Sequence, residues 1–344
     1  MFIPYHETMT IGVLSGAYLL LLFIFILLAA LPTPDQVITK LVPDGLRYMY
    51  AEGEDGQAQL VDSWVKVSDY SRMARFNPDQ SNEYHLFTRE NPSNSQPLVI
   101  GNTQLLQQSN FNAQRRTVIM IHGFLGSATA GSNRALVPAY LSGEDVNVIV
   151  LDWSAGSHWG PNGGAAARAA AKFFNWLNSA SGADASQYHI IGFSVGGHMA
   201  GVIARHMEGD VAYISALDPA SRWEASEVVS YRDSLYTEVI HTSAIATGWG
   251  DPLGHVDFYP NGGSTMPGCF LSIICDHNRS YQYMAESLAT GGFNNAVECR
   301  NRAEASIGQC TLSRRLHMGG RTPKTGMTGI YFLRTNRAPP FSIA

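Results

Sequence analysis

The sequence predicts an α/β fold in which helices cover both faces of a mostly parallel sheet. Short runs of apolar or β-branched residues, each bounded by turn residues, are typical of buried strands. Helix-like segments alternate with these runs, at residues 164–178, which start Ala-rich, and at residues 195–206, directly after a strand. Continuous apolar strands that alternate with helices favour parallel pairing with both faces covered. The predicted strands are residues 84–88, 117–121, 146–151, 188–191, 211–217 and 238–241.

The composition of the 344-residue chain is that of a globular protein, with 45% hydrophobic and 15% charged residues. Its formal net charge is -5, and no run of Lys or Arg occurs in it. Such a surface does not attract a phosphate backbone, so we expect no nucleic-acid partner.

The N-terminal residues are expected to direct the chain out of the cytosol. Residues 11–31 are almost wholly apolar and end in small residues before Pro32. We predict a signal sequence over residues 1–30, cut near Ala30. A signal anchor is the alternative, because the first basic residue is Lys40 and the apolar run is long enough to span a bilayer. Residues 31–75 show no clear period and are interpreted as an N-terminal extension or propeptide, which leaves residues 76–344 as the main domain.

A glycine-rich turn at residues 192–197 has the pattern of a nucleophile elbow. The sequence Gly-Phe-Ser-Val-Gly-Gly follows a predicted strand and opens a predicted helix. The flanking glycines allow a turn sharp enough to hold the Ser194 hydroxyl clear of the sheet, at the positive end of the helix. An ordinary glycine-rich turn is the alternative, but the strand–turn–helix context favours Ser194 as a nucleophile.

A serine hydroxyl needs a base that removes its proton, and this base is predicted to be His277. His277 lies in the polar segment 275–280, late in the chain, as the chain order Ser, Asp, His requires. A surface histidine in a loop is the alternative. We expect His241 and His255 to be structural, and His198 lies on the helix that the serine opens.

The acid that orients the base is predicted to be Asp218. It ends the apolar run 211–217 and lies 24 residues after Ser194 (218 minus 194). That distance holds one helix and one strand, so both side chains should emerge at the same edge of the sheet. A turn made with Pro219 is the alternative interpretation. The rival acids are Asp152, Asp251, Asp257 and Asp276.

Two backbone amides are expected to form an oxyanion hole. Val195 follows the nucleophile and supplies the first. Phe124, in the segment His122-Gly123-Phe124 after the strand 117–121, is predicted to supply the second. A plain strand-ending turn is the alternative for that segment. This chemistry requires no metal or organic cofactor.

The four cysteines form two close pairs, and we predict that Cys269 is bonded to Cys275 and Cys299 to Cys310. Their spacing is not that of a zinc site. Asn278-Arg279-Ser280 is the only glycosylation sequon that we find. A glycan there would obstruct His277, so we predict that Asn278 is unmodified.

Taken together, these motifs resemble the pancreatic lipase family, which includes lipoprotein, hepatic and pancreatic lipases, phospholipases A1 and the insect yolk proteins. The resemblance runs from about residue 84 to residue 341 and rests on the motifs at 122–124, 192–196, 217–220, 255–263 and 275–280. It implies the α/β-hydrolase fold. Residue by residue, it implies a catalytic triad and an oxyanion hole made by Ser194, Asp218, His277, Phe124 and Val195.

The lid segment of this family lies between the cysteines that match Cys269 and Cys275. Here the whole segment is Phe270, Leu271, Ser272, Ile273 and Ile274. So short a lid hardly covers a large acyl pocket and resembles the reduced lid of the phospholipase A1 branch. Its apolar tip is expected either to dip into a lipid surface or to contact the rim of the sheet.

The chain ends at Ala344, without the C-terminal β-sandwich through which pancreatic lipases bind colipase, so we expect no colipase. The resemblance implies a secreted, extracellular serine ester hydrolase that acts on lipid at a membrane or lipid-droplet surface. Within the family we favour a phospholipase A1 or a broad lipid esterase over a strict triacylglycerol lipase. The alternative is an inactive lipid-binding or yolk-type storage protein, but such relatives typically lose the nucleophile, and here all three triad positions hold competent residues.

Overall fold

The computed structural model describes residues 76–158, 162–291 and 293–343, together with the backbone of four short strands nearer the N-terminus. These strands pair antiparallel, β1 with β4 and β2 with β3. They lie in the predicted N-terminal extension, where the sequence showed no strand period. The predicted signal sequence lies outside the described residues. The strands are β1 (Val37–Lys40), β2 (Tyr48–Glu52), β3 (Ala58–Asp62) and β4 (Trp64–Lys66).

The centre of the molecule is an 11-stranded sheet, in the order β14-β13-β15-β12-β11-β10-β9-β7-β8-β5-β6. From β8 across to β15 every pair is parallel, and the pairs at both ends are antiparallel. The predicted mostly parallel sheet is thereby confirmed. The strands are β5 (Glu83–Phe87), β6 (Gln96–Leu98), β7 (Thr117–Ile121), β8 (Asn147–Asp152), β9 (Tyr188–Phe193), β10 (Tyr213–Leu217), β11 (Thr237–Ile240), β12 (Val256–Pro260), β13 (Ala296–Cys299), β14 (Arg315–Leu316) and β15 (Gly329–Leu333).

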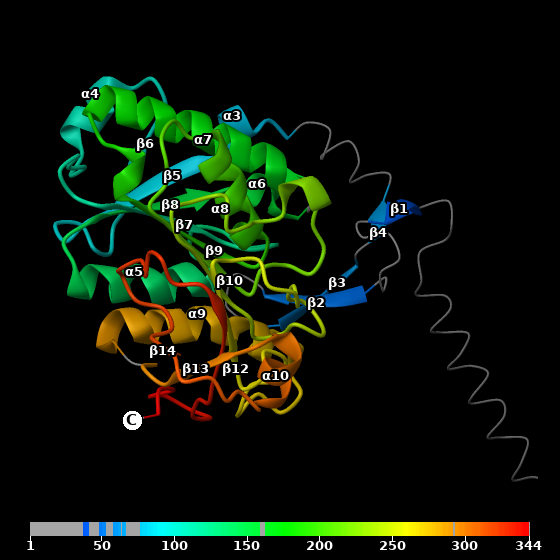
Figure 1. Cartoon of the computed structure of the whole chain (residues 1–344). Helices are drawn as coiled ribbons and strands as arrows, with labels where there is room; N and C mark the ends of the chain where they lie inside the picture. Colours follow the sequence, from blue (N-terminus) through cyan, green and yellow to red (C-terminus); the bar gives the residue numbers. More distant parts are fainter. Residues whose placement is uncertain are drawn as a thin grey trace, which may run out of the picture.

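Helices cover both faces of this sheet (Figure 1), with α7 and α8 on one face and α5 and α9 on the other. Strand β7 shows why: Ile119 is buried in the cluster that contains α7 and α8, and its neighbour Val118 is buried in the cluster that contains α5 and α9. The helices are α3 (Pro78–Ser81), α4 (Thr103–Gln108), α5 (Gly131–Gly143), α6 (Ser154–Ser157), α7 (Asn162–Ser181), α8 (Val195–His206), α9 (Ile273–Thr290) and α10 (Arg302–Ile307).

The two predicted helices are confirmed as α7 and α8, but α5 and α9 were not predicted. Helix α5 contains Pro138, and a proline in a helical pattern usually argues against a helix. Helix α9 begins inside the predicted lid: the Ser272 side chain accepts a hydrogen bond from the Cys275 N–H and caps the first turn. Ile273 and Ile274 therefore belong to a helix rather than to the lid loop.

The residues after Cys310 extend the same sheet. They supply β14, which pairs with β13, and β15, which lies between β13 and β12. Up to residue 343, then, the described C-terminal residues belong to the hydrolase-type sheet and form no separate sandwich. Among the described helices, none has the length and apolarity needed to cross a bilayer.

Candidate active site

The carboxyl ends of β9, β10 and β11 bring the predicted nucleophile and acid to one edge of the sheet. In the parallel register Leu217 lies opposite both Phe193 and Ile240. The next residues along β9 and β10 are Ser194 and Asp218, so the two are neighbours across adjacent strands. The Ser194 N–H donates to the Leu217 carbonyl at 2.9 Å, which ties the two strand ends together.

Ser194 has the strained backbone of a sharp strand-to-helix turn. Its φ is 56° and its ψ is −121°, and it is the residue that precedes α8. A non-glycine residue in this region costs about 1–3 kcal/mol and persists only where the surroundings enforce it. Gly192 makes so tight a turn possible, since a Cβ built there would lie 2.0 Å from the Gly196 carbonyl oxygen. The turn therefore holds the serine at the N-terminal end of the helix dipole.

His277 is hydrogen-bonded to Asp218, as the sequence predicted. Its Nδ1–H donates to Asp218 Oδ2 at 2.5 Å, with the carboxylate fully buried and the imidazole 6% exposed. His277 lies in α9 rather than in a surface loop, and its ring centroid is 4.6 Å from that of Phe193, the residue before the nucleophile. Because Nδ1 is bound to the acid, Nε2 is the ring nitrogen left to accept a proton.

The Asp218 carboxylate is held by four donors. The Thr242 and Ser243 N–H groups donate to Oδ1 at 2.7 and 3.0 Å, and the Ser243 hydroxyl joins His277 in donating to Oδ2. Burial raises the pKa of this carboxyl, but the bonds from His277, Ser243 and Thr242 outweigh it and hold the pKa below its ordinary value. The acid therefore stays ionised in a buried site.

Ser243 was not identified from the sequence. It lies three residues after the end of β11, the parallel neighbour of β10, so its place in the loop at the carboxyl edge was the available signal. Its hydroxyl also lies 3.4 Å from His277 Nδ1 and 2.6 Å from the Thr247 hydroxyl. A short chain of hydroxyls thus leads from the loop after β11 to the acid.

The two predicted oxyanion donors lie beside the nucleophile. Val195 is the first residue of α8, so its N–H has no intrahelical partner. Gly123, the residue before Phe124, lies against Ser194, because a Cβ built at Gly123 would be 2.9 Å from the Ser194 Cβ. The geometry thus brings both segments to the serine.

The rival acids have other partners. Asp152 accepts from the Ala128 and Ser154 N–H groups, Asp251 pairs with Arg302, Asp257 with His241, and Asp276 accepts from the Met266 N–H.

The remaining histidines of this region have structural bonds, as expected. His241 lies between the Trp249 carbonyl and the Asp257 carboxylate, and His198 bonds the Ala220 carbonyl. His255 accepts from the Thr237 N–H.

The segment between Cys269 and Cys275 projects into solvent. A disulfide joins the two cysteines, and a second joins Cys299 to Cys310. Phe270 and Leu271 are 81% and 86% exposed, which is unusual for large apolar side chains. The tip of the lid therefore does not contact the sheet rim.

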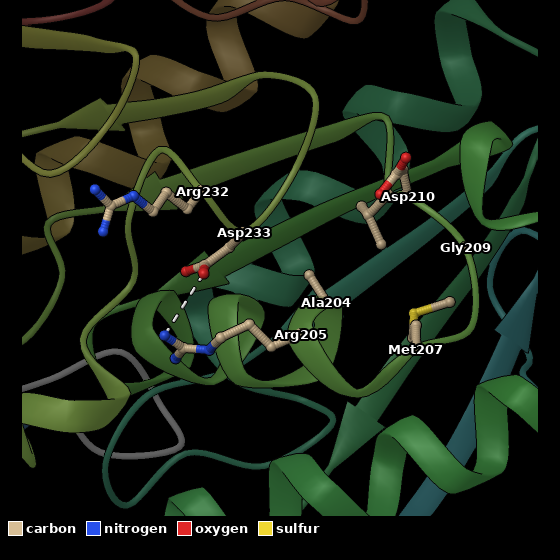
Figure 2. A pocket seen from close by; sticks show the side chains of 8 residues that line it. Ala204, Arg205, Met207, Gly209, Asp210, Arg232 and Asp233 are labelled. Atoms are coloured by element: carbon tan, nitrogen blue, oxygen red, sulfur yellow. Dashed lines mark ion pairs between the residues drawn. The ribbon is translucent and has the colours of Figure 1, made fainter.

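A hollow at the opposite edge of the sheet is separate from this site (Figure 2). It lies between the end of α8 and the loop that enters β10, and the Arg205–Asp233 ion pair, at 3.5 Å, lines it. Arg205 also donates to the carbonyls of Glu227 and Val228. The charged groups that line the hollow thus make local structural contacts. Among the described residues, no group of three or more His, Cys, Asp or Glu side chains is arranged to hold a metal ion.

Fold and site together define a protein of the α/β-hydrolase class. Within it, the chain belongs to the Lipase family, whose model matches residues 48–341. It is 33% identical to Lipase member H of Xenopus tropicalis over 248 residues, which are 66% of this chain and 52% of that protein. It is 32% identical to pancreatic triacylglycerol lipase of Homo sapiens over 243 residues, 61% of this chain and 52% of that protein.

The chain thus spans about half the length of these relatives. Among solved structures, a hyperthermophilic esterase from Pyrobaculum calidifontis overlaps 97% of this chain and 84% of its own, at 13% identity and a TM-score of 0.31.

Proposed function

We propose that this protein is a serine carboxylic ester hydrolase that releases fatty acid from lipid. Ser194 attacks the ester carbonyl while His277 Nε2 takes its proton. The N–H groups of Val195 and Phe124 bind the resulting oxyanion, and His277 then protonates the leaving alcohol. Water hydrolyses the acyl-enzyme by the same steps.

The observation that carries this proposal is the hydrogen bond between His277 and the buried Asp218, placed beside the strained Ser194 turn. The bond fixes the imidazole tautomer, and the carboxylate stabilises the imidazolium that forms during attack. Membership of the Lipase family supports the same chemistry.

The substrate that fits best is a phospholipid, cleaved as by a phospholipase A1. The support is the lid segment, in which five residues separate the bonded cysteines and the tip is turned to solvent. Such a lid leaves the approach to the serine open to a substrate with a large head group. Relatives of the chain include a protein named for triacylglycerol, which makes that ester the second candidate.

We also propose that the lid tip docks on a lipid surface. Burial of Phe270 and Leu271 in lipid is worth about 2 kcal/mol for each side chain. The Arg337 guanidinium lies 5.8 Å from the Phe270 ring centroid, which places a cation next to this apolar tip. Insertion of the tip brings the N-terminal end of α9, and with it His277, to the membrane. The two disulfides support secretion into an oxidising compartment.

The activity test compares a phosphatidylcholine and a triacylglycerol as substrates for the secreted protein and its Ser194→Ala variant. Release of the sn-1 fatty acid from phosphatidylcholine alone, lost in the variant, supports a phospholipase A1. Turnover of the triacylglycerol identifies a lipase. If neither lipid is cleaved, the hydrolase proposal fails and a lipid-binding or storage role replaces it.

The docking test uses sedimentation with phospholipid vesicles. Leu271→Ser is expected to lower vesicle affinity about 30-fold, since about 2 kcal/mol of burial is lost. Its hydrolysis of a dissolved short-chain ester should stay unchanged. Ile100→Ser is the matched control, because Ile100 is an exposed apolar residue that follows β6 at the far end of the sheet. Equal affinity of the two variants would contradict docking by the lid.

A further inference from the structure

We propose that His122 is a positioning residue that fixes the oxyanion donor of Phe124 before substrate arrives. The proposal rests on the ester-hydrolase function above and goes beyond it. His122 itself does not contact the substrate in this proposal. It acts through the peptide between Gly123 and Phe124, whose carbonyl oxygen it binds.

The carbonyl of that peptide is held from two sides. His122 Nδ1 lies 3.0 Å from the Gly123 carbonyl oxygen, and the Gly126 N–H donates to the same oxygen at 3.2 Å. Gly126 is packed closely against the imidazole, since a Cβ built at Gly126 would lie 2.7 Å from His122 Nδ1. The carbonyl is thus fixed in direction.

The second ring nitrogen identifies Nδ1 as the donor. His122 Nε2 lies 3.2 Å from the Trp153 N–H, which can only donate, so the neutral ring accepts there and carries its proton on Nδ1. Asp152 Oδ1 is 3.4 Å from the same Nε2. The alternative neutral tautomer, with its proton on Nε2 toward this carboxylate, would leave the Nδ1 lone pair facing the Gly123 carbonyl oxygen.

The ring itself has little freedom to move. His122 is fully buried, and its ring is stacked on that of Trp153, with centroids 5.5 Å apart and planes at 10°. The Trp153 indole N–H in turn donates to the His122 carbonyl at 3.1 Å. These contacts join the His122-Gly123-Phe124 segment, which follows β7, to Trp153, which follows β8.

Fixing the carbonyl fixes the amide. A trans peptide is planar and its N–H points opposite to its C=O, so a carbonyl held toward His122 turns the Phe124 N–H the other way. Gly123 lies against Ser194 and has no side chain to resist rotation of this peptide. A rotated peptide would present its carbonyl oxygen to the developing oxyanion and repel it. The clamp prevents that rotation.

The decisive variant is His122→Phe, which keeps a ring on Trp153 and removes the donor to Gly123. A misplaced oxyanion donor acts only in the transition state, so kcat should fall about 10- to 100-fold while KM stays within about twofold. His122→Gln, whose amide can both donate and accept, should recover part of the lost kcat. A His122→Phe enzyme with wild-type kcat, or one in which only KM rises, overturns the proposal.

A matched control separates positioning from stability. His198 is also a buried histidine, bonded to the Ala220 carbonyl at 2.8 Å and the Val229 N–H at 3.2 Å, and stacked on Trp223. His198→Phe therefore removes the same kinds of bonds from another site. A similar fall in Tm with a kcat loss below about threefold is expected. Equal kcat losses in the two variants would mean that His122 is merely structural.

A measurement on the wild-type protein avoids any dependence on folding of the variants or on activity. In protein labelled with ¹⁵N-histidine, NMR should show His122 with a slowly exchanging proton on Nδ1. A neutral ring with its proton on Nε2 would overturn the clamp even if the enzyme is active. If the protein hydrolyses no ester but the Nδ1 proton is present, the hydrolase proposal fails while the clamp geometry stands.

Discussion

Removal of the Ser243 hydroxyl is the sharpest perturbation of the acid that this structure offers. Ser243→Ala deletes one of the four donors to Asp218 and leaves the other three, including the backbone N–H of residue 243 itself. Both side chains are fully buried, so water does not replace the missing bond without rearrangement.

The magnitude follows from the charge of the acceptor. A hydrogen bond to a buried charged group contributes about 1.5–3 kcal/mol. The part that acts only in the transition state, when His277 becomes charged, lowers kcat, by about 10- to 160-fold if it is the whole contribution. The part already present in the ground state instead lowers Tm, by up to about 3–12 °C for a domain of this size. Thr247→Val removes the outer hydroxyl of the chain without touching the carboxylate, so a smaller effect, below about fivefold in kcat, is expected.

A pH titration of stability gives a second readout. The folded-state pKa of Asp218 is below its ordinary value, so its charge stabilises the fold above the unfolded-state pKa, and this contribution is lost as pH falls through the folded pKa. Without the Ser243 hydroxyl the folded pKa rises, and acid unfolding should begin at higher pH. Kinetics on a dissolved ester measure the change in kcat. Thermal unfolding at pH values from about 3 to about 7, a range that brackets the titration of a carboxyl group, measures the loss of stability in acid. Unchanged kcat, Tm and acid midpoint in Ser243→Ala would refute the reasoning.

Three further outcomes are expected. Asp276→Asn should keep activity and should not lower Tm at pH 7. Burial raises the pKa of this carboxyl, so its charge does not stabilise the fold, and an amide oxygen still accepts from the Met266 N–H. A large loss of kcat would mean that Asp276, and not Asp218, orients His277. Asn278 should carry no glycan, since its side chain is 6% exposed in α9, and mass spectrometry of the secreted protein checks this. Gly192→Ala should abolish secretion of folded protein, because its Cβ would overlap the Gly196 carbonyl; a soluble variant with wild-type Tm contradicts that overlap.

The sequence predicted that Ser194 and Asp218 lie together because each of them follows a strand. Ser194 and Asp218 each come directly after an apolar run, and in a parallel sheet the ends of such runs meet at one edge. His277 was reached through chain order and through family resemblance. Its helix was not predicted, because Ser272, Ile273 and Ile274, which cap and begin that helix, were assigned to the lid.

The supporting bonds could not be predicted because they cross between strands. Ser243 binds Asp218 because β11 lies next to β10. The order of strands in a sheet cannot be predicted from the residues of any one strand. The role of His122 depends likewise on β8 bringing Trp153 beneath the loop after β7. The exposure of Leu271 depends on where the disulfide-bonded segment sits on the surface.

The most direct test of the account is covalent labelling of the secreted protein with a fluorophosphonate, which reacts with activated serines. With Ser194 as the nucleophile, we expect a single adduct on the peptide that contains Ser194, formed in step with the loss of ester hydrolysis and absent from Ser194→Ala. An adduct on a different serine, or hydrolysis that survives complete labelling of Ser194, would contradict it.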